Sequence, residues 1–86
     1  MITIELFGVP RLRAGRDALD VEAKTLGDAL RALASGCPAL DPSVIEDGKL
    51  KPFYAIALNG AVVPSDPRTP LADGDILLLL SADAGG

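Results

Sequence analysis

Histidine is missing from the sequence, and cysteine occurs once, as Cys37. Without an imidazole, a serine or cysteine nucleophile activated by histidine is excluded, and so are the commonest metal sites. One cysteine forms neither an internal disulfide nor a cysteine-based metal cluster. The carboxylates are scattered, so no acid–base constellation stands out. We therefore expect no metal site and no catalytic centre in the chain. We interpret Cys37 as a half-buried loop thiol, with a reactive thiol as the alternative.

Aromatic residues are also scarce, at 3% of the 86 residues: Phe7, Phe53 and Tyr54. The core of this one-domain chain must therefore consist of Leu, Ile, Val and Ala. No apolar run approaches the roughly 20 residues that span a bilayer. The opening "MITIELFG" lacks the basic start and long apolar stretch of a signal peptide. These absences predict a protein of the cytoplasm without a membrane partner.

Basic residues are outnumbered, eight against twelve acidic ones, which gives a net charge of −4. Binding to nucleic acid requires a concentrated basic surface, so we expect no nucleic-acid partner. Arg11, Arg13 and Arg16 lie close together in "RLRAGR". We interpret this stretch as a solvated loop, and a docking patch for an acidic partner is the alternative.

Alternating apolar residues predict strands. Ile2, Ile4 and Leu6 alternate with polar residues in "MITIELFG", and a second strand around 18–21 follows a turn at Gly15. The pair is typical of an antiparallel hairpin with a long loop. A third strand, "FYAIALNG", ends in an Asn-Gly pair that favours a tight hairpin to the short edge strand "AVVP".

The stretch "KTLGDALRALASG" predicts a helix, which Thr25 caps and which ends near Gly36 and Pro38. Its apolar stripe comprises Leu26, Ala29, Leu30 and Leu33. Propensity gives no reason for Gly27 in the first turn. In the irregular stretch 37–52 that follows, we expect a single helical turn near residues 43–46. In the connection "SDPRTPLADGD", Leu71 is expected to reach the core.

The last predicted strand, "ILLLLS", is apolar on both faces, as is typical of a strand at the centre of a sheet. We place it beside the first strand, which is also strongly apolar. One main helix can cover only one face, so the other face is expected to expose an apolar row. Such rows usually mark a partner surface. The order of elements predicts an α+β roll.

The segments "IALNGAVV" and "PLADGDILLLL", followed by Gly85-Gly86, together resemble the ThiS/MoaD family of ubiquitin-like sulfur carriers. The resemblance covers nearly the whole chain. It implies a ubiquitin-like β-grasp roll, with a mixed sheet of four to five strands and one main helix packed on one face. It further implies that residues 1–81 form this domain and that residues 82–86 form a flexible tail ending at the reactive glycine.

In this family, a partner enzyme of the ubiquitin-activating type uses ATP to adenylate the terminal carboxylate, here that of Gly86. Sulfur from a persulfide then replaces AMP, and the thiocarboxylate donates sulfur to a biosynthetic enzyme. The resemblance therefore implies a carrier, not an enzyme, that binds no cofactor itself. Gly85 and Gly86 lack a β-carbon, so the backbone can enter a narrow channel in the partner.

The resemblance also places the partner-facing residues. It implies that Leu78 and Leu80 face the partner with Ala57, while Leu77 and Leu79 belong to the core. The alternative is that all four leucines are buried under residues 37–52. In the tail, Ala84 is slim. Asp83 pairs with a basic group at the partner's channel mouth, or weakens the match to a standard activating enzyme, or only increases solubility.

Several pathways share this chemistry. The size of the chain and the "SDPRTPLADGD" stretch favour a molybdopterin synthase small-subunit type, which would form a heteromer with a large catalytic subunit. Carriers for thiamine, cysteine or tRNA thiolation are alternatives. A ubiquitin-like modifier joined to lysines and a non-covalent β-grasp interaction module are further alternatives.

Overall fold

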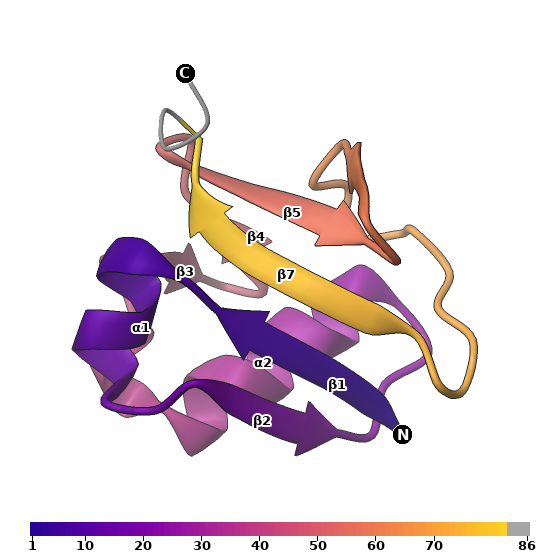
Figure 1. The fold of residues 1–86 in the computed structure, drawn as a ribbon, viewed down its shortest axis with the longest axis horizontal. Helices are drawn as coiled ribbons and strands as arrows, with labels where there is room; N and C mark the ends of the chain where they lie inside the picture. The colour runs from indigo at the N-terminus through magenta and orange to yellow at the C-terminus, as the bar shows by residue number, and fades with distance from the viewer. Residues whose placement is uncertain (83–86) are drawn as a thin grey trace.

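A five-stranded mixed sheet forms the frame of the protein in the computed structural model, which describes residues 1–82 (Figure 1). The strand order is β2-β1-β7-β5-β6. β7 lies at the centre and runs parallel to β1, while the other neighbours in this sheet pair antiparallel. The expected central place of the last strand, beside the first, is confirmed. The strands are β1 (Ile2–Leu6), β2 (Ala18–Val21), β5 (Tyr54–Leu58), β6 (Ala61–Val63) and β7 (Ile76–Ser81).

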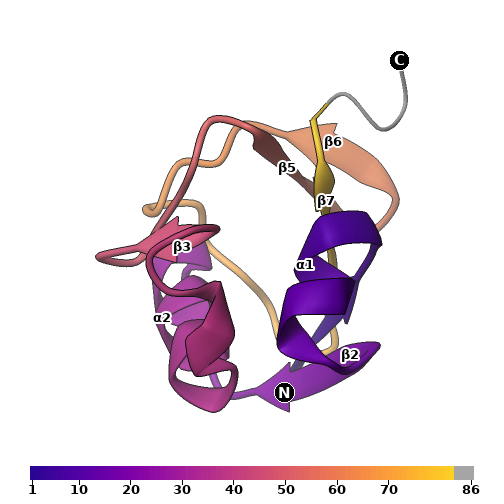
Figure 2. The same ribbon diagram turned by 90° about the vertical axis from the view of Figure 1, so that its left-hand side faces the viewer.

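The main helix, α2 (Leu26–Gly36), crosses behind the sheet (Figures 1 and 2). The Thr25 hydroxyl accepts a hydrogen bond from the Asp28 amide at 3.2 Å and so caps the helix as expected. The apolar stripe of α2 packs against the inward side chains of the sheet, and Leu71 packs against this core from the connection before β7. The fully buried core includes Ile2, Ile4, Leu6, Leu26, Leu30, Leu33, Ile56, Leu77 and Leu79.

The structure explains Gly27, for which the sequence offered no reason. Its amide donates to the Pro67 carbonyl at 2.9 Å. A β-carbon at this position would lie 3.0 Å from the Pro67 side chain and 3.1 Å from that carbonyl oxygen. The connection between β6 and β7 therefore runs tightly over the first turn of α2, and glycine allows this close approach.

Residues 8–14 form a helix, α1 (Gly8–Ala14), so the expected long loop between the first two strands is wrong. The helix ends where Gly15 takes the left-handed conformation (φ 71°) and donates to the Arg11 carbonyl at 3.0 Å. Pro10 is buried, and α1 packs against the C-terminal strand β7. α1 thus closes one end of the core (Figure 2). Arg11 and Arg13 belong to this helix and not to a loop.

The stretch 37–52 is more ordered than expected, and the helical turn predicted near residues 43–46 is wrong. The turn lies earlier, as the 3-10 helix η1 (Pro38–Leu40). β3 (Ile45–Glu46) and β4 (Lys49–Leu50) form a small hairpin. Its two turn residues, Asp47 and Gly48, both have positive φ, as a type I′ turn requires. Cys37, expected to be half-buried, is only 4% exposed.

Among residues 1–82, no helix has the length and hydrophobicity needed to cross a bilayer. The expected division into a domain of residues 1–81 and a tail of residues 82–86 stays a prediction. Most of that tail lies outside the described residues.

Candidate functional site

The side of the sheet that faces away from α2, here called the outer face, carries the residues expected to meet a partner. In the strand register, Leu78 lies between Glu5 of β1 and Ala57 of β5, and Leu80 lies opposite Ala55. Leu77 and Leu79 point the other way into the core, where both are fully buried. Leu78 and Leu80 remain partly exposed. The structure thus brings Leu78, Leu80 and Ala57 together on one face.

Ala57 is on this face but is only 5% exposed. In the strand register it lies between Leu78 of β7 and Val62 of β6. Its small side chain therefore contributes little exposed area of its own to the outer face. Ile76 and Val62, both exposed, extend the apolar area along β7 and β6.

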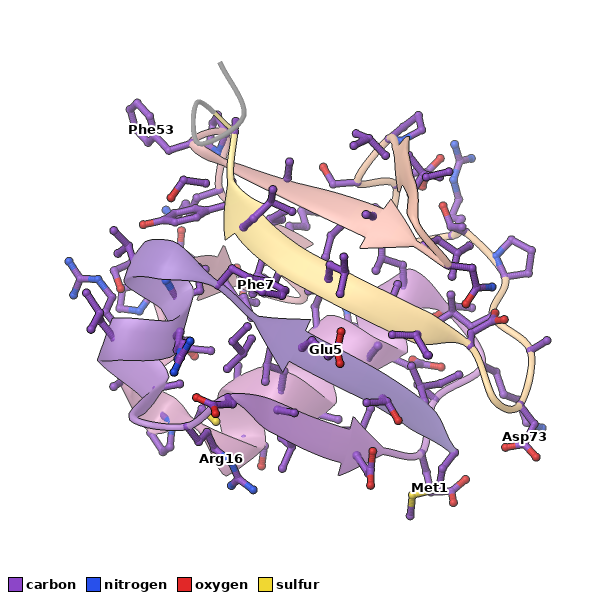
Figure 3. All side chains as sticks on the ribbon, viewed as in Figure 1. Met1, Glu5, Phe7, Arg16, Phe53 and Asp73 are labelled. Atoms are coloured by element: carbon purple, nitrogen blue, oxygen red, sulfur yellow. The ribbon has the colours of Figure 1, made fainter. Side chains whose placement is uncertain are left out.

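The outer face changes character across β1. Thr3, Glu5 and Asp20 are polar and lie over β1 and β2, and the Thr3 hydroxyl donates to the Asp20 carboxylate at 2.7 Å. Figure 3 shows Glu5 on β1, and in the strand register Glu5 is the residue of this polar half that pairs with Leu78. The face is therefore apolar over β7, β5 and β6 and acidic over β1 and β2.

At the C-terminal end of β7, the main chain is held from both sides. The Ala82 amide donates to the Phe53 carbonyl at 2.8 Å, and the Phe7 amide donates to the Leu79 carbonyl at 3.0 Å. Phe53 is 79% exposed and Phe7 is 46% exposed. Figure 3 shows Phe53 pointing away from the body, and Phe7 at the junction of β1 and α1. The sequence distinguishes these aromatics only by their scarcity, which predicts no role for them.

At the opposite end of β7, the "LNG" and "ADGD" motifs bind each other. The Asn59 side chain donates to Asp75 at 2.9 Å and accepts from the Ile76 amide at 2.9 Å. The second oxygen of Asp75 accepts from the Ala72 amide at 2.8 Å. This amide, and then the Asn59 side chain, lower the pKa of Asp75. We call this arrangement the Asn59–Asp75 clamp, and it fixes where β7 begins.

Two of the three arginines in "RLRAGR" have local partners. Arg11 pairs with Asp17 at 2.7 Å, and the Arg16 side chain donates to the Ala18 carbonyl at 3.1 Å. Elsewhere in the chain, Arg68 pairs with Asp66, and its hydrogen bonds to that carboxylate lower the pKa of Asp66. These contacts are exposed and stabilise short loops.

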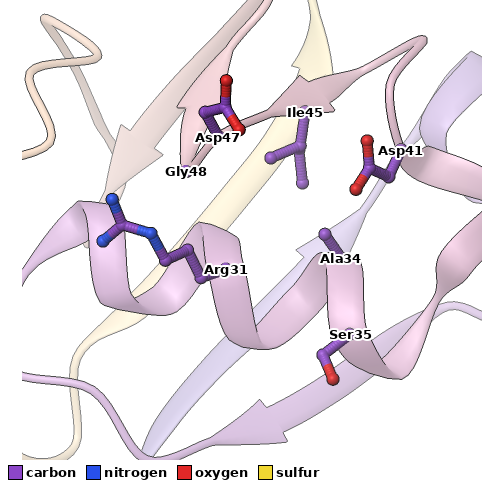
Figure 4. Close-up of a pocket in the computed structure, with 7 residues that line it drawn as sticks. All are labelled: Arg31, Ala34, Ser35, Asp41, Ile45, Asp47 and Gly48. Atoms are coloured by element: carbon purple, nitrogen blue, oxygen red, sulfur yellow. The ribbon is translucent and has the colours of Figure 1, made fainter.

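A hollow of about 340 Å³ lies on the helix side of the molecule, between α2 and the β3–β4 hairpin (Figure 4). Arg31 lies so close to Gly48 that a β-carbon there would come within 2.8 Å of the arginine Nε. Asp41 and Asp47 contribute the opposite charge to the rim. The hollow is separated from the outer face by the sheet, and no predicted site residue lines it.

The remaining predicted site residues, Asp83, Ala84, Gly85 and Gly86, lie outside the residues that the structure describes. Their roles stay predictions. The structure places their point of departure, Ala82, at the end of β7 beside Phe53.

Comparison with known proteins gives a consistent set of relatives. A family model, the ThiS family, matches residues 4–86. Small archaeal modifier protein 3 of Haloferax volcanii is 41% identical over 64 residues, which are 72% of this chain and 70% of that protein.

Solved structures with the same fold include the crystal structure of SAMP1 from Haloferax volcanii. It has a TM-score of 0.78 and 32% identity over 99% of this chain and 98% of that one. A chain in the complex of subunits 1 and 2 of molybdopterin-converting factor from Helicobacter pylori 26695 has a TM-score of 0.64. It is 28% identical over 99% of this chain and 97% of that chain. These neighbours agree with the β-grasp roll expected from the sequence.

Proposed function

Because the chain belongs to the ThiS family, we propose that it is a sulfur carrier whose Gly86 carboxylate becomes a thiocarboxylate. The observation that carries the proposal is that the family match runs through the terminal Gly85-Gly86 pair. The fold supports it, since β7 ends at Ser81 and only a few residues separate this position from Gly86 in the sequence.

In the proposal, the thiocarboxylate forms on a partner enzyme by adenylation, sulfur transfer and reductive release. A carboxylate is a poor acceptor for sulfur because oxide would have to leave. The Gly86 carboxylate oxygen therefore attacks the α-phosphorus of ATP, and pyrophosphate leaves. The terminal sulfur of a persulfide next attacks the acyl carbon and expels AMP. A thiol then attacks the donor's sulfur in this acyl disulfide and breaks the sulfur–sulfur bond that came from the persulfide, so that a disulfide forms with the donor and the thiocarboxylate is left on Gly86.

This chain contributes one reactive group and a surface that positions it. Gly85 and Gly86 carry no side chain, so the partner can surround the backbone closely. In the proposal, Leu78, Leu80 and Ala57 form the docking area, and Ala84 passes the channel mouth. Asp83 meets a basic group there.

A reconstitution tests the proposal directly. The chain is incubated with ATP, a persulfide donor, a thiol and the activating enzyme encoded in the same genome. We expect intact-mass analysis to show an increase equal to the difference between a sulfur and an oxygen atom. Deleting Gly86 should abolish the increase without changing the melting temperature. An unchanged mass for the complete chain with an enzyme that is active on ATP would contradict the proposal.

For the acceptor, we propose a large subunit of the molybdopterin synthase type. The similarity to a chain in the molybdopterin-converting factor complex supports this choice. The thiocarboxylated chain should return to the carboxylate form when mixed with that subunit and its substrate. If only a thiazole, cysteine or tRNA-thiolating enzyme consumes the thiocarboxylate, the acceptor is assigned wrongly while the carrier function stands.

Protein modification is a second candidate, supported by the 41% identity to a protein named as a small archaeal modifier. The same activated carboxyl would then form an isopeptide bond with a lysine of another protein. Peptide mass spectrometry of the native cells distinguishes the two functions. The last basic residue before Gly86 is Arg68, so trypsin would leave residues 69–86 attached to each modified lysine. Lysines that carry this remnant, and lose it when the gene is deleted, would favour the modifier.

A further inference from the structure

Phe53 is an exposed aromatic side chain on a firmly held backbone. It follows Pro52 in a turn that is closed by a 3.1 Å hydrogen bond from the Tyr54 amide to the Lys51 carbonyl. Proline at this turn position fixes the backbone before Phe53. The Phe53 carbonyl accepts the Ala82 amide at 2.8 Å. The main chain is therefore fixed from both sides while 79% of the residue is exposed.

All the aromatic residues of this chain lie near the C-terminal end of β7. Tyr54 pairs with Ser81 in the β5–β7 ladder, Phe53 lies next to Ala82, and Phe7 lies beside Leu79. The large buried side chains are aliphatic instead. Aromatic residues are enriched at protein interfaces, and a rigidly held one loses little conformational freedom on binding.

The length of the tail restricts where a partner can sit. Four residues follow Ala82 in the sequence, and four extended residues span at most about 14 Å. The molecule itself measures 27 × 26 × 21 Å. A standard interface covers about 800 Å² on each partner, which corresponds to a radius of roughly 16 Å. A partner that holds Gly86 in its active site therefore comes within about 14 Å of Ala82, and an interface of standard size centred on Ala82 includes its neighbour Phe53.

We propose that Phe53 is an anchor for the adenylating enzyme, and that its ring enters an apolar pocket beside the channel that takes the tail. This inference rests on the proposed function and names a contact outside the predicted patch of Leu78, Leu80 and Ala57. Leu78 and Leu80 supply apolar area across the sheet, whereas Phe53 fixes the partner at the point where the tail leaves.

The test compares Phe53→Ala with Phe53→Trp and with a control, Leu12→Ala. Leu12 is 80% exposed on α1, so its truncation removes an equally exposed apolar side chain from another element. Adenylation kinetics are measured with the activating enzyme from the same genome. Binding of each chain to that enzyme is measured separately without ATP.

We expect Phe53→Ala to raise the KM for the chain, and to weaken binding, by about 10- to 30-fold, as truncation of an interface anchor does. The kcat should stay within about twofold, because the anchor acts before chemistry. Phe53→Trp should retain most affinity, and Leu12→Ala should change neither value. All melting temperatures should stay close to that of the unmodified chain.

Two results would overturn the inference. One is unchanged binding and KM for Phe53→Ala while the unmodified chain reacts normally. The other is a fall in kcat with KM unchanged, which would mean that Phe53 only orients its own tail. If the unmodified chain binds through Phe53 but is never adenylated, the anchor stands and the proposed function fails.

Discussion

Leu77 and Leu79 differ from Leu78 and Leu80 only in the face of β7 from which they project. The first two are fully buried against the core, and the other two are partly exposed on the outer face. The residue type and the strand are the same, so the difference arises from what covers each face. α2 and the β3–β4 hairpin lie on the inner side of the sheet (Figure 2), whereas Leu78 and Leu80 stay partly exposed on the outer face.

This comparison separates two tasks within one strand. The inner leucines stabilise the fold, so their loss should lower the free energy of unfolding. We propose that the outer leucines bind the partner, so their replacement should raise the KM of the chain with the activating enzyme. Leucine variants on the two faces test this separation directly, and variants of the Asn59–Asp75 clamp test what fixes the start of the strand that carries both faces.

The largest effect is expected for Leu79→Ala. Removing a fully buried leucine side chain costs the lost burial plus the cavity left behind, about 3 kcal/mol of unfolding free energy. Denaturant titration measures it. The matched variant, Leu78→Ala, should cost about 1 kcal/mol or less, because that side chain is already partly hydrated. Equal losses for the two variants would show that the faces are not distinct.

Leu78→Glu should impair the reaction with the activating enzyme and leave the stability of the fold nearly unchanged. A carboxylate on the outer face stays hydrated, but it also lies beside Glu5 and must be desolvated when a partner covers it. We expect a rise in KM with the activating enzyme of about 30-fold, which equals about 2 kcal/mol, with the fold retained. A normal KM would remove Leu78 from the docking area.

Asn59→Ala tests the clamp at the start of β7. It removes the hydrogen bonds to Asp75 and from the Ile76 amide, and it places alanine at a φ of 50°. We expect a loss of about 2 kcal/mol in unfolding free energy. Asn59→Gly accepts the positive φ, so it isolates the hydrogen bonds. If Asn59→Gly is as stable as the unmodified chain, the clamp contributes nothing beyond backbone conformation.

The smallest effect concerns pH. Because hydrogen bonds lower the pKa of folded Asp75, its carboxylate stabilises the fold above the ordinary aspartate pKa of about 3.9. This contribution should disappear as pH falls through the lowered folded value. Melting temperatures measured downward from about pH 5 should therefore fall less steeply in Asp75→Asn than in the unmodified chain.

Asp66→Asn is the control for the pH series. The pKa of Asp66 is also lowered, but by Arg68, which is two residues away and can pair with it in the unfolded chain as well. Its substitution should change the pH dependence less than Asp75→Asn does. If Asp66→Asn changes the pH dependence of the melting temperature more than Asp75→Asn does, protonation of the Asn59–Asp75 clamp is not the cause of the lost stability in acid.

Much of the fold was predictable because local patterns and long-range pairing agree. The Asn59-Gly60 turn, the stripe on α2 and the apolar run of β7 each require the arrangement that is observed. The expectations from the sequence fail where the local signal is short. Pro10 lies in the first turn of α1 and left-handed Gly15 follows its last residue, and Asp47-Gly48 forms the turn of the β3–β4 hairpin.

The outer face was predictable only with the family resemblance, because a run of leucines looks the same on both faces. The placement of Phe53 was not predictable. It depends on the turn at Pro52 and on pairing between β5 and the end of β7, and the two segments are far apart in sequence. Alternation along one strand carries no information about such a neighbour.

The central claim of the proposed function is that other proteins activate a carboxyl group at Gly86. The most direct measurement is the intact mass of the protein isolated from its native cells, after treatment with a reagent that alkylates thiocarboxylates. We predict a chain that ends at Gly86, with a fraction carrying one alkyl group at the C-terminus. A native chain that continues past Gly86 without being trimmed would contradict the claim.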